Sequence, residues 1–109
     1  MIDIQEFRKL DLRVGTIVEV KPFTEAKKPA YKLMIDFGPL GTKRSSAQIT
    51  GHYRPEDLVG KQVVAAVNLP SKIIAGFTSE VLVLGANDAS GNVILLKPET
   101  TMPNGAKVS

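Results

Sequence analysis

The stretch "TKRSSAQI" gathers side chains that could bind an anion or a polar chain. Lys43 and Arg44 are adjacent cations, two hydroxyls follow, and Gln48 adds an amide. Cationic groups pair with phosphates and carboxylates, whereas hydroxyls and amides also bond base edges or a peptide backbone. Strand periodicity sets Arg44, Ser46 and Gln48 on one face, opposite the apolar residues. This pattern predicts a polar face directed at solvent or a ligand.

The sequence contains no comparable group of side chains that could act together in catalysis, and we assign no catalytic residue. His52 is the single histidine and stands in a polar connection, where we interpret it as a surface residue. Cysteine is absent, so thiolate metal sites and disulfides are excluded, and a lone histidine is a poor start for a transition-metal site. We therefore expect neither a metal site nor a cofactor.

The composition is that of an ordinary globular domain. The chain has 109 residues, of which 43% are apolar and 23% charged, and we interpret residues 1–109 as one domain. No apolar run approaches the ~20 residues that a membrane span needs, and the charged N-terminus lacks the pattern of a signal peptide. We expect a cytoplasmic protein without membrane insertion. The net charge of +3 does not by itself indicate a polyanion partner.

The periodicity predicts short strands with one helical insert. A short amphipathic helix is expected at residues 3–10, and a single helical turn at 54–60. Alternating patterns predict five main strands, and a further strand-like run at 92–98 leads into a C-terminal extension, 93–109. The main strands are expected at 10–20, 31–38, 42–49, 61–69 and 76–86. Closure into a small all-β barrel, with the helix between strands three and four, is the OB arrangement.

Several residues strengthen this prediction through a resemblance. Asn68, Leu69, Lys72, Gly76 and Ser79 stand where the OB-fold tRNA-binding domain family has its strand, Asn-Leu, Lys, Gly and Ser pattern. The sequence resembles this family over nearly its whole length, and it is most similar to the CsaA-type branch in "SSAQI" and "AGFTSEVLVLG". The resemblance implies an OB fold, homodimerisation and a chaperone linked to protein export.

The chain departs from the tRNA-binding branch at two places near the expected binding face. That branch has Ser-Gly-Leu where this chain has Ser46-Ala47-Gln48, and Gly-Met where this chain has Glu80-Val81. Glu80 would repel phosphate in a groove, and it could instead pair with Lys72 or Lys43.

On an OB barrel the ligand lies across strands two and three, between the first and the last inter-strand loops. Six of the fourteen basic residues map to this surface, and the alternative is that the outer face of strand three is merely solvated. Ser79 is a further donor, and Asn68 either contacts ligand or stabilises its turn. The predicted binding residues are Lys27, Lys28, Lys32, Lys43, Arg44, Ser46, Gln48, Asn68, Lys72 and Ser79.

Aromatic and apolar side chains complete the expected groove. Tyr31 and Phe23 are expected to be an exposed aromatic pair. Two aromatic rings are few for stacking the unpaired bases of a long single strand. An apolar floor is expected from Met34, or from Ile73 and Ile74 in the last loop, although the two isoleucines could equally plug the barrel.

The extensions carry apolar side chains that could pair two copies of the chain. The expected dimer interface comprises Ile4, Phe7 and Leu10 from the helix with Ile94 and Leu96 near the C-terminus. The alternative is that both extensions plug the open end of the barrel.

Two functions remain open from the sequence. The first is an export-related chaperone that binds unfolded or precursor polypeptides in the groove and retains tRNA binding. The second is a tRNA-binding or structured-RNA-binding module without chaperone activity. Oligosaccharide binding suits the fold, but the aromatic platforms that sugars favour are scarce.

Overall fold

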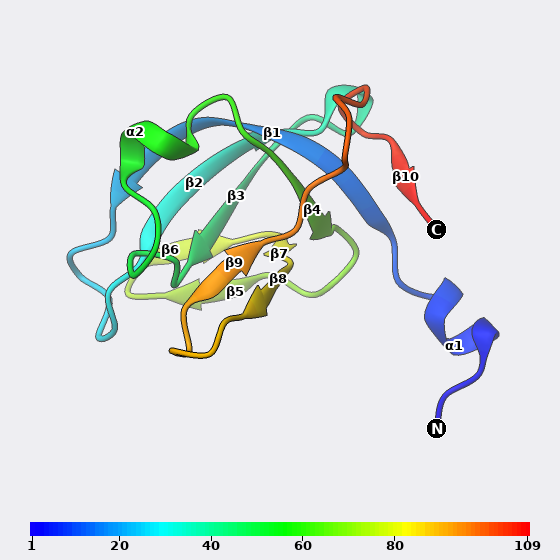
Figure 1. Ribbon diagram of the computed structural model, residues 1–109, viewed down its shortest axis with the longest axis horizontal. Helices are drawn as coiled ribbons and strands as arrows, with labels where there is room; N and C mark the ends of the chain where they lie inside the picture. Colours follow the sequence, from blue (N-terminus) through cyan, green and yellow to red (C-terminus); the bar gives the residue numbers. More distant parts are fainter.

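The computed structural model describes residues 1–109, and its main element is a curved antiparallel sheet of order β3-β2-β1-β4-β7 (Figure 1). The long strand β1 (Leu12–Pro22) lies at the centre. Its first half pairs with β4 (Gln62–Ala66), and its second half pairs with β2 (Tyr31–Asp36), which in turn pairs with β3 (Thr42–Ala47). A register shift after Ile17 bends β1, so that one strand serves both sides of the barrel.

The barrel closes where β3 meets the segment that follows β6 (Phe77–Ser79). The N–H of Glu80 donates to the carbonyl of Arg44 at 2.8 Å, and the N–H of Ser46 donates to Ser79 Oγ at 3.0 Å. Closure thus depends on one backbone bond and on side chains instead of a continuous ladder. The result is a nearly closed five-strand barrel, which confirms the predicted OB-type fold.

The region expected as the fifth strand, 76–86, is divided into three short strands. The first is β6; β7 (Leu82–Val83) pairs with β4, and β8 (Gly85–Asn87) pairs with β9 (Val93–Leu95). The expected loop before it contains β5 (Lys72–Ile74), which forms a hairpin with β6. Ala75 and Gly76 adopt positive φ values of 46° and 81° at the turn, a conformation that the alternating pattern did not reveal.

The interior is filled by the inward residues of the strands. Ile17, Leu33, Ile35 and Phe37 are fully buried, and α2 (Pro55–Leu58) covers one end of the barrel with Leu58. The predicted helical turn between strands three and four is therefore confirmed. A 3₁₀ turn, η1 (Gly38–Leu40), joins β2 to β3.

The two ends of the chain behave differently. The helix α1 (Ile4–Arg8) is shorter than predicted, begins after Asp3, and buries none of its residues; it stands clear of the barrel (Figure 1). The plug interpretation is therefore wrong for α1. Near the C-terminus, Leu95 is buried in the core, and the unpredicted strand β10 (Lys107–Val108) pairs with the start of β1. No helix has the length and apolar character that crossing a membrane requires.

Candidate ligand-binding groove

Strand β3 has the two faces that its sequence predicts. Ser45 and Ile49 are buried at 0% and 3% exposure, while Arg44 and Gln48 on the other face are exposed. Lys43 shares the inward parity but stays half-buried, because it lies at the entry of the strand, opposite Ile35 of β2. Arg44 and Gln48 therefore point outward, as the alternation predicts.

A groove of about 410 Å³ opens beside the end of β3. Its walls come from the end of β3, from the β5–β6 hairpin, from the segment leading into β7, and from β9. Its volume falls in the range typical of ligand pockets. Four of the predicted binding residues line it: Ser46, Gln48, Lys72 and Ser79.

The floor of the groove is apolar, but its residues differ from those expected. Ile74 lines the groove as predicted, together with Leu69, Val81, Leu82 and several neighbours. Ile73 and Met34, also predicted, do not line it. Ile73 is 73% exposed on the other side of the hairpin strand, and Met34 lies on the outer face of β2 opposite Arg44. Alternation within β5 explains why only one isoleucine faces the groove.

Arg44 and Glu80 form a compact charged pair at the rim. Glu80 Oε1 accepts hydrogen bonds from the Arg44 backbone N–H at 3.0 Å and from Arg44 Nε at 3.3 Å. The backbone N–H of Arg44, followed by the guanidinium, lowers the pKa of the Glu80 carboxyl, although partial burial opposes this. Glu80 is thus ionised at neutral pH. The carboxylate forms its ion pair with Arg44 and not with the expected partners Lys72 and Lys43, although the charge of Lys43 also lowers its pKa.

Lys32 lies in a cluster with two aromatic rings. Its Nζ lies 4.8 Å from the centre of the Phe23 ring and 5.4 Å from that of Phe77, and it pairs with Glu25 at 3.6 Å. Such cation–aromatic contacts are mildly stabilising. The Phe23 and Phe77 rings meet edge to face at 5.4 Å, which joins the loop after β1 to the hairpin.

The expected exposed aromatic pair is wrong. Phe23 and Tyr31 are only 3% and 8% exposed, and Tyr31 packs in the core cluster with its hydroxyl donating to the Tyr53 carbonyl. Phe77, which the sequence analysis did not single out, is the half-buried ring that remains at this surface. Its position follows from the hairpin, which the alternating pattern could not reveal.

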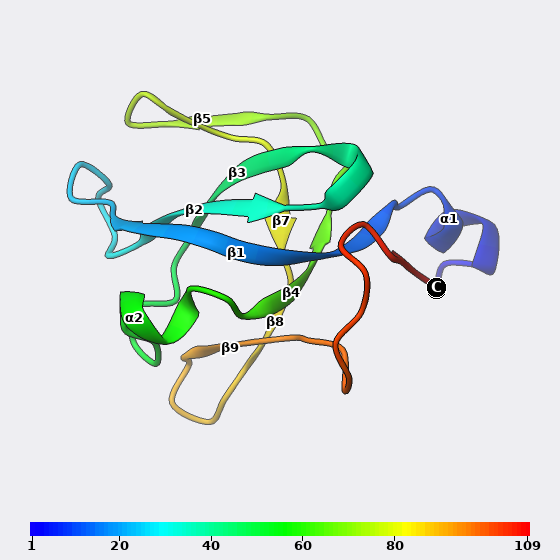
Figure 2. The same ribbon diagram turned by 90° about the horizontal axis from the view of Figure 1, so that it is seen from above.

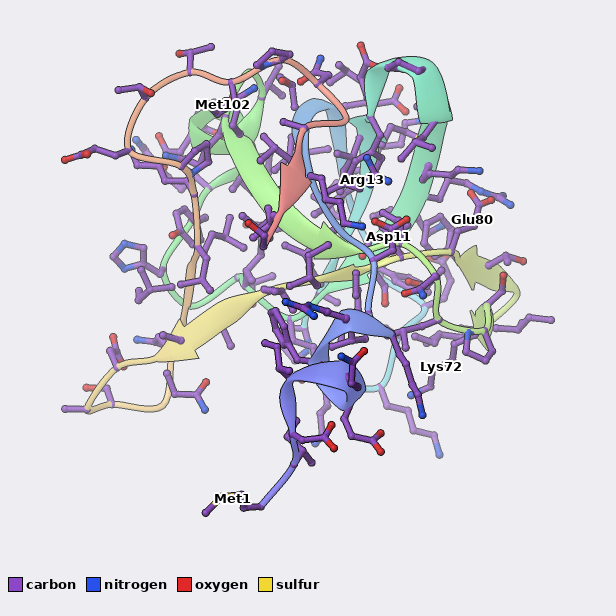
Figure 3. All side chains as sticks on the ribbon, turned by 90° about the vertical axis from the view of Figure 1, so that its right-hand side faces the viewer. Met1, Asp11, Arg13, Lys72, Glu80 and Met102 are labelled. Carbon is purple, nitrogen blue, oxygen red and sulfur yellow. The ribbon has the colours of Figure 1, made fainter.

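The remaining predicted cations carry no ion pair. Lys27 and Lys28 are exposed in the loop after β1, Lys72 is exposed on β5, and Lys43 lies near enough to Glu80 to act on its carboxylate. Figure 3 shows Lys72 and Glu80 on the same flank of the molecule. Of the six predicted cations only Lys72 lines the groove, and the others lie on β2, on β3 and in the loop after β1. We refer to the six together as the cationic stripe: Lys27, Lys28, Lys32, Lys43, Arg44 and Lys72.

Asn68 has a different environment from the other predicted residues. Its Oδ1 accepts from the Asp11 N–H at 2.9 Å, and its Nδ2 donates to the Lys9 carbonyl at 2.7 Å. It does not line the groove. These two bonds hold the connection between α1 and β1 against the end of β4, which favours the turn-stabilising alternative over ligand contact.

The structure does not bring candidate metal ligands together. His52 is exposed, and its ring meets the Tyr53 ring edge to face, with centroids 4.7 Å apart. No cluster of three histidine, aspartate or glutamate side chains could hold a metal ion.

Comparison with known proteins identifies the family to which the chain belongs. Residues 12–107 match the family described as "Putative tRNA binding domain". The chain belongs to this tRNA-binding domain family. The match runs from the first residue of β1 to β10, and so includes every strand that frames the groove.

Two solved structures cover the whole chain. The CsaA chaperone of Bacillus anthracis str. Ames is 55% identical with a TM-score of 0.95, covering 100% of this chain and 99% of that chain. The CsaA chaperone protein of Picrophilus torridus is 53% identical with a TM-score of 0.94, covering both chains completely. The predicted resemblance to CsaA-type members of the tRNA-binding domain family is confirmed.

A curated relative is much longer than this chain. The methionine–tRNA ligase of Methanocaldococcus jannaschii is 42% identical over 107 residues, which make up 98% of this chain but 16% of the ligase. The family's domain thus occurs both alone, as in the CsaA structures, and as a small part of a large enzyme.

Proposed function

We propose that this protein is an export-related chaperone that holds unfolded or precursor polypeptides in the groove and also binds tRNA. The observation that carries the proposal is the groove itself, which has an apolar floor and polar side chains at its rim: Ser46, Gln48, Lys72, Ser79 and Glu80. Apolar side chains of an unfolded client would pack on Leu69, Ile74 and Leu82. Its backbone carbonyls would accept bonds from Lys72 and Gln48. The likeness to CsaA chaperones supports this interpretation.

The tRNA-binding part of the proposal is supported by the cationic stripe and by family membership. Phosphate contacts dominate nucleic-acid affinity, and they require clustered cations without specific base contacts. With Phe77 as the one half-buried ring at this surface, recognition of RNA shape and backbone fits better than stacking of many bases. The alternative function, a tRNA-binding module without chaperone activity, depends on the stripe alone. Neither function assigns a catalytic role to any residue.

A homodimer through the terminal extensions is part of the proposal. Ile4, Phe7 and Leu10 are 56%, 37% and 39% exposed, although α1 has an amphipathic sequence. Leu96 is 44% exposed and Ile94 half-buried, while their neighbours Val93 and Leu95 face the barrel. An exposed apolar helix face is the kind of surface that pairing of two copies covers.

The chaperone function is tested by the aggregation of a denatured client protein in the presence of stoichiometric protein. Leu82 and Leu40 form a matched pair, because both are exposed leucines, at 53% and 40%, and only Leu82 lines the groove. We expect Leu82→Ser to weaken suppression of aggregation several-fold, and Leu40→Ser to leave it unchanged. Unchanged aggregation with the wild-type protein contradicts the chaperone function.

The tRNA-binding and homodimer parts of the proposal have separate tests. Labelled tRNA and an unfolded precursor peptide, titrated separately and together, should compete if they share the groove. Light scattering should give twice the chain mass at micromolar concentration, and Phe7→Glu should halve it. A wild-type monomer at that concentration contradicts the dimer.

A further inference from the structure

The ion pair between Arg44 and Glu80 affects which ligands can bind at the rim of the groove. Glu80 meets Arg44 through three hydrogen bonds across the seam of the barrel: one from its own N–H and two to its carboxylate. The two residues are 36 positions apart in the sequence. Their side chains are 32% and 45% exposed, so both remain accessible to a ligand.

The pair changes how a phosphate can approach Arg44. An arginine usually holds a phosphate through two parallel N–H donors, and Nε belongs to one such fork. Here Nε already donates to Glu80 Oε1, which occupies the position that a ligand anion would take. A phosphate must therefore displace the carboxylate or bind beside a negative charge, and both are unfavourable.

A polypeptide backbone can form hydrogen bonds with both Arg44 and Glu80. Glu80 Oε2 has no hydrogen-bond partner in the structure, and neither terminal nitrogen of Arg44 has one. A peptide unit carries one donor and one acceptor, so it can give its N–H to the carboxylate and its carbonyl to the guanidinium. A phosphodiester has only acceptors, and it can use only half of this arrangement.

We propose that Glu80 is a specificity-determining residue that favours polypeptide over nucleic-acid backbone at the rim of the groove. This inference deepens the proposed function, because it presupposes the groove as the binding site. Loss of the carboxylate's charge frees one cation for phosphate. Affinity for RNA should then increase and depend more steeply on salt.

The test compares Glu80→Gln with Glu56→Gln. Glutamine keeps an oxygen that can accept from the Arg44 N–H but removes the charge. Glu56 also pairs with an arginine, Arg54, at 3.5 Å, and it lies on α2, on the opposite side of the barrel from β5 (Figure 2). Both variants change the net charge equally, so a long-range effect of charge appears in both. Thermal unfolding of each variant checks that the fold is intact.

Three probes are titrated at several salt concentrations: unfractionated tRNA, inorganic polyphosphate, and a reduced and amidomethylated protein that cannot refold. For Glu80→Gln we expect affinity for both polyanions to rise about tenfold. The slope of log affinity against log salt should steepen by about 0.7–0.9, the value for one additional phosphate contact. Affinity for the unfolded polypeptide should stay level or fall. Glu56→Gln should change none of the slopes.

The outcomes separate this inference from the function on which it depends. If the wild-type protein binds neither tRNA nor the unfolded polypeptide, the proposed function is contradicted. The affinity for polyphosphate still measures the effect of the Glu80 charge in that case. Equal effects of Glu80→Gln and Glu56→Gln on polyphosphate overturn the inference, as does an equal gain for the unfolded polypeptide. In the double variant with Arg44→Gln the gain should vanish, and persistence of the gain also overturns the inference.

Discussion

The salt dependence of tRNA binding is the most informative prediction, because its size follows from the ion pairs of the cationic stripe. Lys32 pairs with Glu25 and Arg44 with Glu80, which leaves four of the six cations without a carboxylate partner. Each phosphate that a free cation neutralises contributes about −0.7 to −0.9 to the slope of log affinity against log salt. We therefore expect a slope of about −3 to −3.5, which is roughly a 50- to 150-fold loss between 50 and 200 mM salt.

Replacement of one free cation tests this reasoning directly. Lys72→Gln should reduce the slope by about 0.7–0.9, so that the loss over the same salt range falls to roughly 20- to 40-fold. Lys97→Gln removes the same charge from an exposed site beside Lys61 and Asp57, away from the groove, and should leave the slope unchanged. Fluorescence anisotropy with labelled tRNA measures both. A flat salt response, or equal slopes for the two variants, would refute the assignment of the stripe as the RNA-binding surface.

Further predictions concern stability. Asn68→Ala should lower the free energy of unfolding by about 1–2 kcal/mol through loss of its two bonds to backbone, and should leave tRNA and peptide affinities unchanged in titrations. Gly15→Ala would place a methyl group 2.6 Å from Ile35 Cγ2, so we expect a loss of about 1–3 kcal/mol in urea unfolding. The hydrogen bond from the Arg44 N–H lowers the pKa of Glu80, so its stabilisation is present above the unfolded pKa and is lost as the pH falls through the folded pKa. Urea unfolding between pH 3 and 6 should show a shallower pH dependence for Glu80→Gln than for the wild-type protein.

Some of these features could be predicted because they depend on local patterns. The alternation in β3 predicted which side chains leave the core, and Ser45 and Ile49 are buried accordingly. Proline and glycine marked the helical turn at α2 in the same way. Such patterns constrain one strand or one turn at a time, since each follows from backbone geometry within a few residues.

Other features could not be predicted because they depend on partners that are distant in the sequence. Phe23 looks like an exposed loop aromatic, but the hairpin brings Phe77 against it, and the two rings are held at 5.4 Å. From the sequence, Glu80 was expected to pair with Lys72 or Lys43. The seam between β3 and the end of β6 selects Arg44, because the backbone N–H groups of both residues join the same contact.

The sequence by itself determined the barrel, the polar face of its third strand and the family to which the chain belongs. These depend on periodicity, on turn residues and on short motifs, all of which are present in the order of the amino acids. Only the tertiary structure decided which predicted residues share the groove, which cations are already neutralised, and that α1 stands apart from the barrel. Burial and ion pairing are properties of atoms brought together across the closed sheet, and residue order does not specify those distances.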